Sequence, residues 1–367
     1  MRKAFFTLIF LAMLLTSGCR ATPEKTAPPQ APASSPTENA GADEGASTPE
    51  TSGIPQAADI LPQQTELPPL RFTFPTPVPQ PVSVWRPPLY PVPWAQQPYD
   101  HFLFIRPIPA DQKNWPLANY RYGGIFFDDV VHTGVDIPSP IGTDVMAAGS
   151  GKVVWVGYGL LTFEQDNLED PYGLAVAIKH DFGYEDQPIY TLYAHLSEVF
   201  VIRNQFVQTG EVIGKVGDTG MTTGPHLHFE VRLIRNDYFA TRNPELWIAP
   251  PQGWGVLAGR VLETNGDKLF AKTVNVISNS TAQRWSVITY GPKSVRPDPY
   301  YQENMVLGDL PAGRYTIEIA YADKREKQEI EIQPGLVSFF TFRGEEGFSL
   351  LPPATPVPIR GGPPANP

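Results

Sequence analysis

The chain has 367 residues, of which 42 are proline and 41% are hydrophobic, and its formal net charge is −10 at pH 7. This length fits two folded domains of ordinary size beside unfolded segments, and the acidic balance without a basic cluster argues against nucleic-acid binding. A single cysteine, Cys19, excludes an intrachain disulfide, so stability must come from core burial or a metal.

Residues 1–18 have the features of a secretory signal peptide. Arg2 and Lys3 precede an apolar stretch from Ala4 to Leu15, which is too short for a comfortable membrane span, and small residues follow it. The residues from Leu15 to Cys19 resemble a bacterial lipoprotein signal, in which the cysteine becomes the lipidated N-terminus. We therefore expect an exported protein of the cell envelope that faces away from the cytoplasm and is anchored in the membrane through Cys19. Plain secretion is the alternative.

Residues 19–101 are rich in proline, and we expect them to form a disordered linker. Up to about Glu66 the segment consists mainly of small, polar and proline residues, which cannot bury enough apolar surface to fold. Aromatic residues appear between Leu67 and Pro98, so this second part is able to lie against a folded domain. A linker of this kind extends roughly 3.1 Å per residue where it is polyproline-like, and so holds a domain away from a membrane surface.

Residues 102–250 are predicted to form the first folded domain. Six short segments are rich in Val, Ile and Tyr and are bounded by Gly or Pro, and no long helical period interrupts them. They are Asp144–Ala148, Gly151–Tyr158, Leu174–His180, Ile189–His195, Val212–Val216 and His226–Leu233. Their spacing predicts a mainly β fold, with an antiparallel sheet or sandwich.

The segment from His226 to Leu233 carries polar side chains on one face of its predicted strand. Because successive side chains alternate, His226, His228 and Glu230 share one face, and the other face is apolar. Residues i and i+2 lie roughly 6.6 Å apart, so one imidazole can bind a metal while its neighbour points at the metal-bound water. Glu230 either orients an imidazole or is a solvated strand residue, and the sequence leaves both open.

Two further segments offer metal-binding or proton-transferring groups. His132 and Asp136 lie upstream, and His195 ends a segment of strand-like composition. In a straight strand positions 132 and 136 would be roughly 13 Å apart, so the chain must bend there if both side chains bind one metal. Gly134 makes such a bend plausible.

Five spaced motifs, in this order, resemble the lysostaphin-type zinc endopeptidases that cleave the peptide bridges of peptidoglycan. The motifs are His132-Thr-Gly-Val-Asp136, Pro140-Ile-Gly-Thr143, Ala147-Ala-Gly-Ser-Gly-Lys-Val153, Tyr193-Ala-His-Leu-Ser197 and Gly217-Asp-Thr-Gly-Met-Thr-Thr-Gly-Pro-His-Leu-His-Phe-Glu-Val231. The resemblance covers about a third of the chain and implies a β-sheet fold with its site in an open groove.

The same resemblance implies one zinc ion held by His132, Asp136 and His228, with His195 and His226 as the catalytic histidines. Three protein ligands leave the fourth position of a catalytic zinc for water or substrate, so the ligand count agrees. Which histidine takes the water proton stays open, because the two titrations can be coupled. The remaining two histidines, His101 and His180, are expected to lie outside the site.

Residues 255–345 contain seven further strand-like segments and neither histidine nor cysteine, which predicts a β-sandwich accessory domain. Its segment Gly308–Ile317 resembles prealbumin-like or carboxypeptidase-regulatory-like modules, with wall binding, spacing and stabilisation of the enzyme all open as roles. Residues 351–367 are expected to form a flexible tail. In the first domain, the acidic run from Glu164 to Asp170 is interpreted as a solvated loop.

The sequence therefore predicts a zinc-dependent endopeptidase that hydrolyses peptide bonds in peptidoglycan. The competing hypothesis is a non-catalytic envelope module that binds or activates another wall hydrolase. Relatives of that kind lose zinc ligands, whereas every expected ligand and both catalytic histidines are present here. A third possibility is an endopeptidase whose substrates are proteins.

Overall fold

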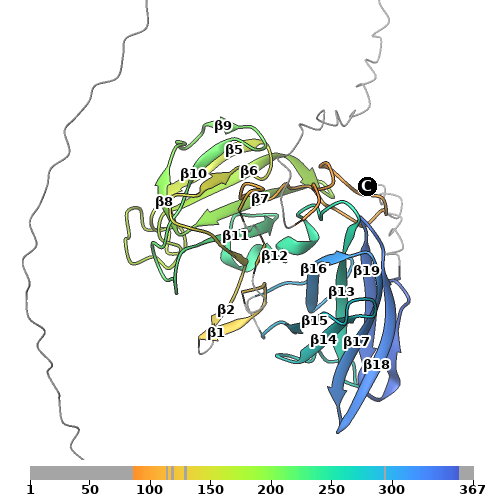
Figure 1. Cartoon of the computed structure of the whole chain (residues 1–367). Coiled ribbons are helices and arrows are strands. Elements are labelled where there is room, and N and C mark those ends of the chain that lie inside the picture. The colour runs from red at the N-terminus through yellow and green to blue at the C-terminus, as the bar shows by residue number, and fades with distance from the viewer. Residues whose placement is uncertain (1–85, 113–114, 117–119, 128–129, 293–294, 355–367) are drawn as a thin grey trace, which may run out of the picture. The chain divides into compact units, whose positions relative to one another are not determined.

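A computed structural model describes residues 86–354, except 113–114, 117–119, 128–129 and 293–294. In these residues the ordered elements are twenty strands and three short 3-10 helices, η1 (Tyr238–Ala240), η2 (Pro244–Leu246) and η3 (Gly344–Glu346). The predicted mainly β fold is confirmed (Figure 1). The predictions for the signal peptide, for Cys19, for most of the linker and for most of the tail fall on residues outside this range.

The largest sheet has seven strands and carries the histidine-rich strand near one edge (Figure 1). Its strands, in spatial order, are β12 (Thr241–Arg242), β11 (His226–Leu233), β7 (Gln187–Ala194), β6 (Ala175–Tyr184), β5 (Gly151–Gly157) and β9 (Phe206–Val207), with β3 (Val135–Pro138) also paired to β11. All of these pairings are antiparallel. Strand β11 thus has β7 on one side and β3 and β12 on the other.

Two smaller sheets complete this part of the chain. One contains β4 (Asp144–Met146), β10 (Val212–Val216) and β8 (Leu196–Val199), and the other contains β1 (Ile125–Phe127) and β2 (Val130–Val131). The predicted core face of β11 is fully buried, since Leu227, Phe229 and Val231 are each 0% exposed. The ring of Phe229 lies 5.3 Å from that of Tyr193, which fixes β11 against β7.

Strands β13 to β20, which we call the C-terminal β domain, form two four-stranded sheets. One has the order β16 (Met305–Pro311), β13 (Trp254–Leu262), β19 (Val337–Arg343), β20 (Gly347–Ser349), and the other β15 (Arg284–Ile288), β14 (Thr273–Ser278), β17 (Gly313–Tyr321), β18 (Lys324–Ile332). Apolar side chains of both sheets meet in one core, including Leu257 and Phe340 from the first sheet and Val276 and Ile317 from the second. Sheets that share a core in this way are those of a β-sandwich.

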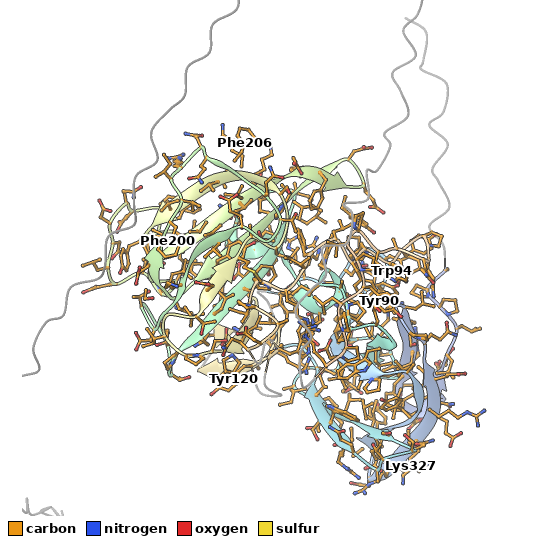
Figure 2. The ribbon with its side chains drawn as sticks, turned by 45° about the horizontal axis from the view of Figure 1, so that its top comes forward. Tyr90, Trp94, Tyr120, Phe200, Phe206 and Lys327 are labelled. Atoms are coloured by element: carbon orange, nitrogen blue, oxygen red, sulfur yellow. The ribbon has the colours of Figure 1, made fainter. Side chains whose placement is uncertain are left out.

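The expected linker range, 19–101, extends further than the structure allows. From residue 86 onward the chain lies against the folded part, where the indole Nε1 of Trp94 donates a hydrogen bond to the carbonyl of Gly335 (2.9 Å). Tyr90 stacks on Trp94, with ring centroids 4.4 Å apart (Figure 2). The aromatic residues explain the difference, because they bury the apolar area that the earlier linker composition lacks.

Buried side chains also pack across the boundary expected between the two domains, residues 102–250 and 255–345. One core cluster contains Phe229 and Trp247 together with Val256, Val306 and Phe339 from the C-terminal β domain. The phenolic oxygen of Tyr301 donates a 2.7 Å hydrogen bond to Asp100. Within residues 86–354, leaving out the four short gaps, no helix is long and apolar enough to cross a membrane.

Candidate metal centre

The side chains of His132, Asp136 and His228 each bring one possible metal-ligand atom to a common point. The Nε2 atom of His132 lies 2.8 Å from Oδ1 of Asp136, and Nδ1 of His228 lies 2.8 Å from the same oxygen. The two nitrogens are 3.0 Å apart. Ligands held about 2.0 to 2.1 Å from a tetrahedral zinc are about 3.3 Å from each other, so a small shift outward would fit the three atoms to that ion.

The pairing of β3 with β11 and a bend before β3 bring these residues together. Asp136 lies directly opposite His228 in the register. The chain leaves β2 at Val131 and enters β3 at Val135, so His132 lies in the intervening bend, as the spacing requires. A Cβ atom on Gly134 would lie 2.4 Å from the carbonyl oxygen of Phe229, which is why only glycine fits in this bend.

In each of the two histidines of the cluster, the ring nitrogen that faces away from the cluster, which we call the outer nitrogen, donates a hydrogen bond to a protein acceptor. Nδ1–H of His132 donates to the carbonyl of Arg121 (3.1 Å), and Nε2–H of His228 donates to the carboxylate of Glu230 (3.1 Å). When each ring is neutral, its proton is held on the outer nitrogen, and the inner nitrogen can present a lone pair to a metal. Two lone pairs and a carboxylate oxygen that converge in this way suit a cation.

The charges of the cluster agree with this interpretation. Burial opposes ionisation of Asp136, but His132 and His228 hold the pKa of its carboxyl well below the usual range. Burial likewise opposes protonation of His228, but its hydrogen bonds to Asp136 and Glu230 raise the pKa to about 9. Without a metal, the inner nitrogen of His228 therefore carries a proton at neutral pH, and a bound cation would take the place of this proton.

Glu230 is buried behind His228, which settles the choice left open by the sequence. Its carboxylate accepts hydrogen bonds from Thr133 Oγ1 (2.6 Å), Tyr172 Oη (2.7 Å) and Arg232 Nε (2.7 Å). Burial raises the pKa of Glu230, but Arg232 and His228 outweigh it and lower the pKa to about 2. The carboxylate is therefore ionised and orients the ring of His228, and it is not a solvated strand residue.

Three of these supporting residues were not predicted. Arg232 follows Glu230 by two positions, so the strand alternation that placed His226, His228 and Glu230 on one face could also have found it. Thr133 and Tyr172 come from segments between strands, where no period indicates which side chain turns inward.

His195 and His226 lie beside the cluster, with their Nδ1–H groups tied to the carbonyls of Thr219 (2.8 Å) and Gly224 (2.7 Å). Their ring centroids are 4.7 Å apart. Nε2 of His226 is 3.5 Å from Oδ1 of Asp136, and the ring centroid of His195 is 5.6 Å from that of His228. The structure thus brings all five expected site residues together.

Both of these histidines are held neutral. Burial, followed by the neighbouring His228 and His226, lowers the pKa of His195 to about 3, and burial lowers that of His226. His195 also has a φ of 61°, in the left-handed region that non-glycine residues rarely adopt. Such backbone strain, of order 1–3 kcal/mol, persists where the surrounding structure requires a particular side-chain direction.

The other two histidines lie away from the cluster. Nε2 of His101 is 3.1 Å from the carboxylate of Asp298, in a buried ion pair. His180 bonds to the carbonyl of Ser150 (3.1 Å) and to Oγ1 of Thr191 (2.9 Å). Both have structural partners.

The acidic loop differs in part from its interpretation as solvated. Glu164, Asp166 and Glu169 are exposed as expected, but Asp170 is fully buried. Its carboxylate accepts hydrogen bonds from backbone N–H groups, including those of Leu161 (2.9 Å) and Tyr172 (3.0 Å). Asp170 therefore shapes the loop that leads to Tyr172.

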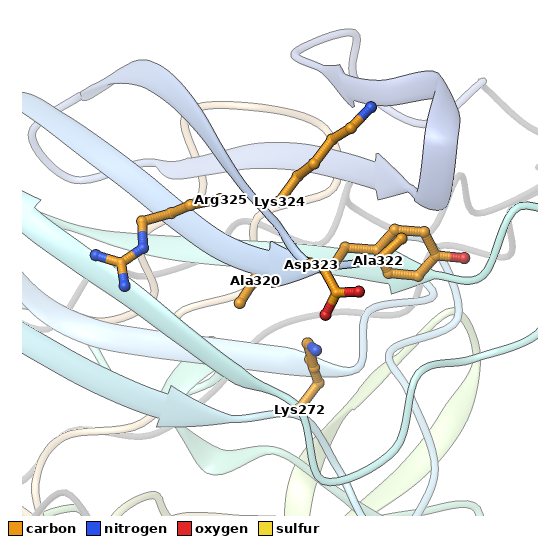
Figure 3. Close-up of a pocket in the computed structure, with 7 residues that line it drawn as sticks. Lys272, Ala320, Ala322, Asp323, Lys324 and Arg325 are labelled. Carbon is orange, nitrogen blue, oxygen red and sulfur yellow. The ribbon is translucent and has the colours of Figure 1, made fainter.

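A separate surface hollow lies at the turn between β17 and β18. It is lined by Lys272, by Asp323 and by the neighbouring residues 320–325 (Figure 3). The carboxylate of Asp323 points toward Lys272, while the side chain of Arg325 extends away from it (Figure 3). None of the lining residues is a histidine, so this hollow offers no counterpart of the metal cluster.

An antiparallel β domain with a buried His-Asp-His cluster and two adjacent histidines has the donor atoms to hold a metal ion. Residues 130–240 match the model of Peptidase family M23, and this part of the chain is a peptidase family M23 domain. The matched range contains His132, Asp136, His195, His226 and His228. The family resemblance predicted from the sequence motifs is confirmed.

Several named proteins are similar to this domain. The DD-carboxypeptidase/endopeptidase Mpg of Neisseria meningitidis serogroup B is 42% identical over 129 residues, which cover 35% of this chain and 26% of Mpg. The peptidoglycan DD-endopeptidase ShyB of Vibrio cholerae is 40% identical over 121 residues, or 33% of this chain and 24% of ShyB. This chain therefore spans only about a quarter of the length of either relative.

Two further similarities concern a lipoprotein and a solved structure. The uncharacterized lipoprotein YgeR of Escherichia coli is 38% identical over 139 residues, which cover 38% of this chain and 47% of YgeR. The catalytic domain of the antimicrobial peptidase lysostaphin from Staphylococcus simulans is 28% identical, with a TM-score of 0.29, over 34% of this chain and 85% of that one.

Proposed function

We propose that this protein is a zinc-dependent endopeptidase that hydrolyses peptide bonds in peptidoglycan. The observation that carries the proposal is the convergence of three donor atoms in an M23 domain, with the outer nitrogen of each ligand ring tied to an acceptor. The name of ShyB, a peptidoglycan DD-endopeptidase, supports the substrate class.

In this proposal, one zinc ion is held by His132, Asp136 and His228. Two imidazole nitrogens and one carboxylate oxygen form a donor set typical of catalytic zinc, which keeps an open position. When bound, zinc supplies Lewis-acid chemistry, in which a carbonyl is polarised and water becomes more acidic. Glu230 keeps His228 in the tautomer that can bind the ion.

His195 and His226 supply the proton transfers of hydrolysis. Because Nδ1–H of each ring is tied to a backbone carbonyl, Nε2 is left as the basic atom. The lowered pKa of both rings keeps them neutral and able to accept a proton from the attacking water. The ring that accepts the water proton then carries an Nε2–H and returns this proton to the leaving amine.

We further propose that the protein is exported and anchored through Cys19, with the residues between Cys19 and residue 86 as a linker to the folded part. The lipoprotein-like residues up to Cys19 and the similarity to the lipoprotein YgeR support this location. The substitution Cys19→Ser should abolish metabolic lipid labelling and move the protein out of the membrane fraction. Membrane retention without lipid label in the wild type would instead indicate another anchor.

The activity can be tested with purified protein, peptidoglycan and a casein control, each with and without a zinc chelator. We expect new peptide termini in peptidoglycan, identified by mass spectrometry, that disappear with the chelator. Binding to peptidoglycan without new termini would favour the non-catalytic envelope module. Cleavage of casein alone would favour an endopeptidase for proteins.

A further inference from the structure

Residues 120–124, which we call the support segment, contact two of the expected ligands, His132 before β3 and Asp136 within it. The carbonyl of Arg121 accepts the Nδ1–H of His132 (3.1 Å), and the carbonyl of Tyr120 accepts the backbone N–H of Asp136 (3.0 Å). Two more backbone hydrogen bonds, both 2.8 Å, pair the segment with the main chain of His132. The support segment lies outside the residues that match the M23 family, so the family domain alone does not contain these contacts.

The other side of the support segment rests on the C-terminal β domain. The backbone N–H of Gly291 donates to the carbonyl of Gly123 (2.8 Å). The ring of Tyr290 lies so close to Gly123 that a Cβ atom there would be 2.3 Å from it, and Gly123 has a φ of 81°. Tyr290 also meets the ring of Tyr122 edge to face, with centroids 5.1 Å apart.

Buried polar contacts fix the side chains of the support segment. The guanidinium of Arg121 pairs with the carboxylate of Glu245, which also accepts the backbone N–H of Gly308 (2.6 Å). The hydroxyl of Tyr122 donates to the carbonyl of Arg296 (3.1 Å) and accepts the N–H of the same residue (3.0 Å). Since buried polar groups are costly to leave unpaired, the segment cannot shift without breaking these bonds.

We propose that the C-terminal β domain positions the metal ligands, with Tyr290 as its main positioning residue. Tyr290 contacts Gly123 and Tyr122, and it acts by holding them so that the Arg121 carbonyl stays in line with the His132 ring. The inference rests on the proposed zinc site. Groups that orient a ligand ring typically contribute 10- to 100-fold in metal affinity, and this sets the scale of the expected effect.

The hydroxyl and the ring of Tyr290 have different partners, so an effect on zinc affinity can be separated from a general loss of stability. The hydroxyl bonds to Asn243 (2.9 Å) and to Glu303 (3.0 Å), neither of which belongs to the support segment, whereas the ring itself packs on Gly123. Tyr290→Phe therefore removes only the polar contacts, and Tyr290→Ala removes the packing as well. Ile317→Ala is the matched control. Ile317 is fully buried in the core between the two sheets of the same domain, so its loss destabilises the domain without removing the ring that packs on Gly123.

The experiment measures zinc affinity in the full chain by competition with a chromophoric chelator, together with thermal unfolding and the Co²⁺ absorption spectrum. Tyr290→Ala should bind zinc about 10- to 100-fold more weakly and alter the Co²⁺ spectrum, while Tyr290→Phe should bind within about 3-fold of wild type. Ile317→Ala should unfold at a lower temperature and keep its zinc affinity. Tyr290→Leu, which retains apolar volume without the flat ring, should resemble Tyr290→Ala and replaces it if that variant does not fold.

Two outcomes would overturn the inference. One is wild-type zinc affinity in folded Tyr290→Ala or Tyr290→Leu, and the other is an equal loss of affinity in Ile317→Ala, which would reduce the effect to destabilisation. A wild-type chain that binds no zinc would instead refute the proposed function, so the two failures are distinguishable.

Discussion

Strands β11 and β18 both place polar side chains on one face, but only β11 buries that face. In β18, Arg325, Lys327 and Glu331 share one exposed face, and only Ile330 and Ile332 on the other face are buried. All eight residues of β11 are buried, including two histidines, a glutamate and an arginine. The comparison shows that alternation predicts the polar face of a strand without revealing whether that face meets water.

Burial of the β11 polar face is costly unless each group is paired. Arg232 meets this condition, since it donates to Glu230 (2.7 Å), to Asn236 (2.7 Å) and to Tyr172 (2.9 Å). A buried ionic network of this kind is weak evidence for stability, because apolar residues of similar volume would often serve as well. Its presence in β11 is better explained by the metal centre that it supports.

The largest effect should come from removing a ligand on β11. We expect His228→Ala to lose both its zinc and all measurable hydrolysis, because two ligands do not hold the ion at the affinity of three. Zinc per chain, measured by atomic emission, should fall from about one to near zero. His180→Ala is the matched control, since it removes a buried histidine outside the cluster and should keep its zinc. Stoichiometric zinc in His228→Ala would contradict the ligand assignment.

The two neutral histidines should separate chemistry from metal binding. His195→Ala and His226→Ala should each lower turnover by about 10² to 10⁴, the usual contribution of a general acid or base, and retain zinc. Zinc content and turnover are to be measured on the same preparations. Loss of zinc from His226→Ala, with retention in His132→Ala, would reverse the two roles.

A smaller effect, on zinc affinity, is expected from changing Glu230, whose carboxylate lies behind the ligand His228. Glu230→Gln keeps the size of the side chain but loses the charge that orients His228, so zinc affinity should fall about 10- to 100-fold. The same substitution on the exposed face of β18, Glu331→Gln, should leave the affinity unchanged. Equal affinities in wild type and both variants would show that burial of the carboxylate has no bearing on the metal.

The sequence predicted those parts of the site that depend on strand alternation and motif spacing. The face shared by His226, His228 and Glu230 followed from the period of two, and the bend between His132 and Asp136 followed from the reach of the chain. Tyr172 and Arg121 could not be predicted in this way. They lie in connecting segments, and only the folded structure shows that they contact Glu230 and His132.

The strands of the C-terminal β domain were likewise predictable, but its contacts with the rest of the chain were not. The apolar positions of β14 and β17 alternate as expected for a sandwich, which made the segments recognisable. Packing of Tyr290 on Gly123 joins residues far apart in the sequence and carries no local signal. Glycine at position 123 is required by this contact, which no turn or strand pattern indicates.

The smallest effect is expected on the exposed face of β18, where Lys327 projects from the C-terminal β domain (Figure 2). Its amine is 3.3 Å from the carboxylate of Glu318, a carboxylate that Arg284 and Arg325 also approach. Lys327→Ala should therefore change the free energy of unfolding by no more than about 0.5 kcal/mol and leave zinc affinity and hydrolysis unaltered.

Ile317→Ala, in the core of the same domain, should cost about 2 to 5 kcal/mol by comparison, because it leaves a cavity. Denaturant unfolding and peptidoglycan digestion of both variants measure the contrast. If Lys327→Ala kept its stability but lost hydrolysis of peptidoglycan, the exposed face of β18 would contact substrate. The exposed polar face of β18 would then have a function of its own, and the contrast with the buried polar face of β11 would no longer hold.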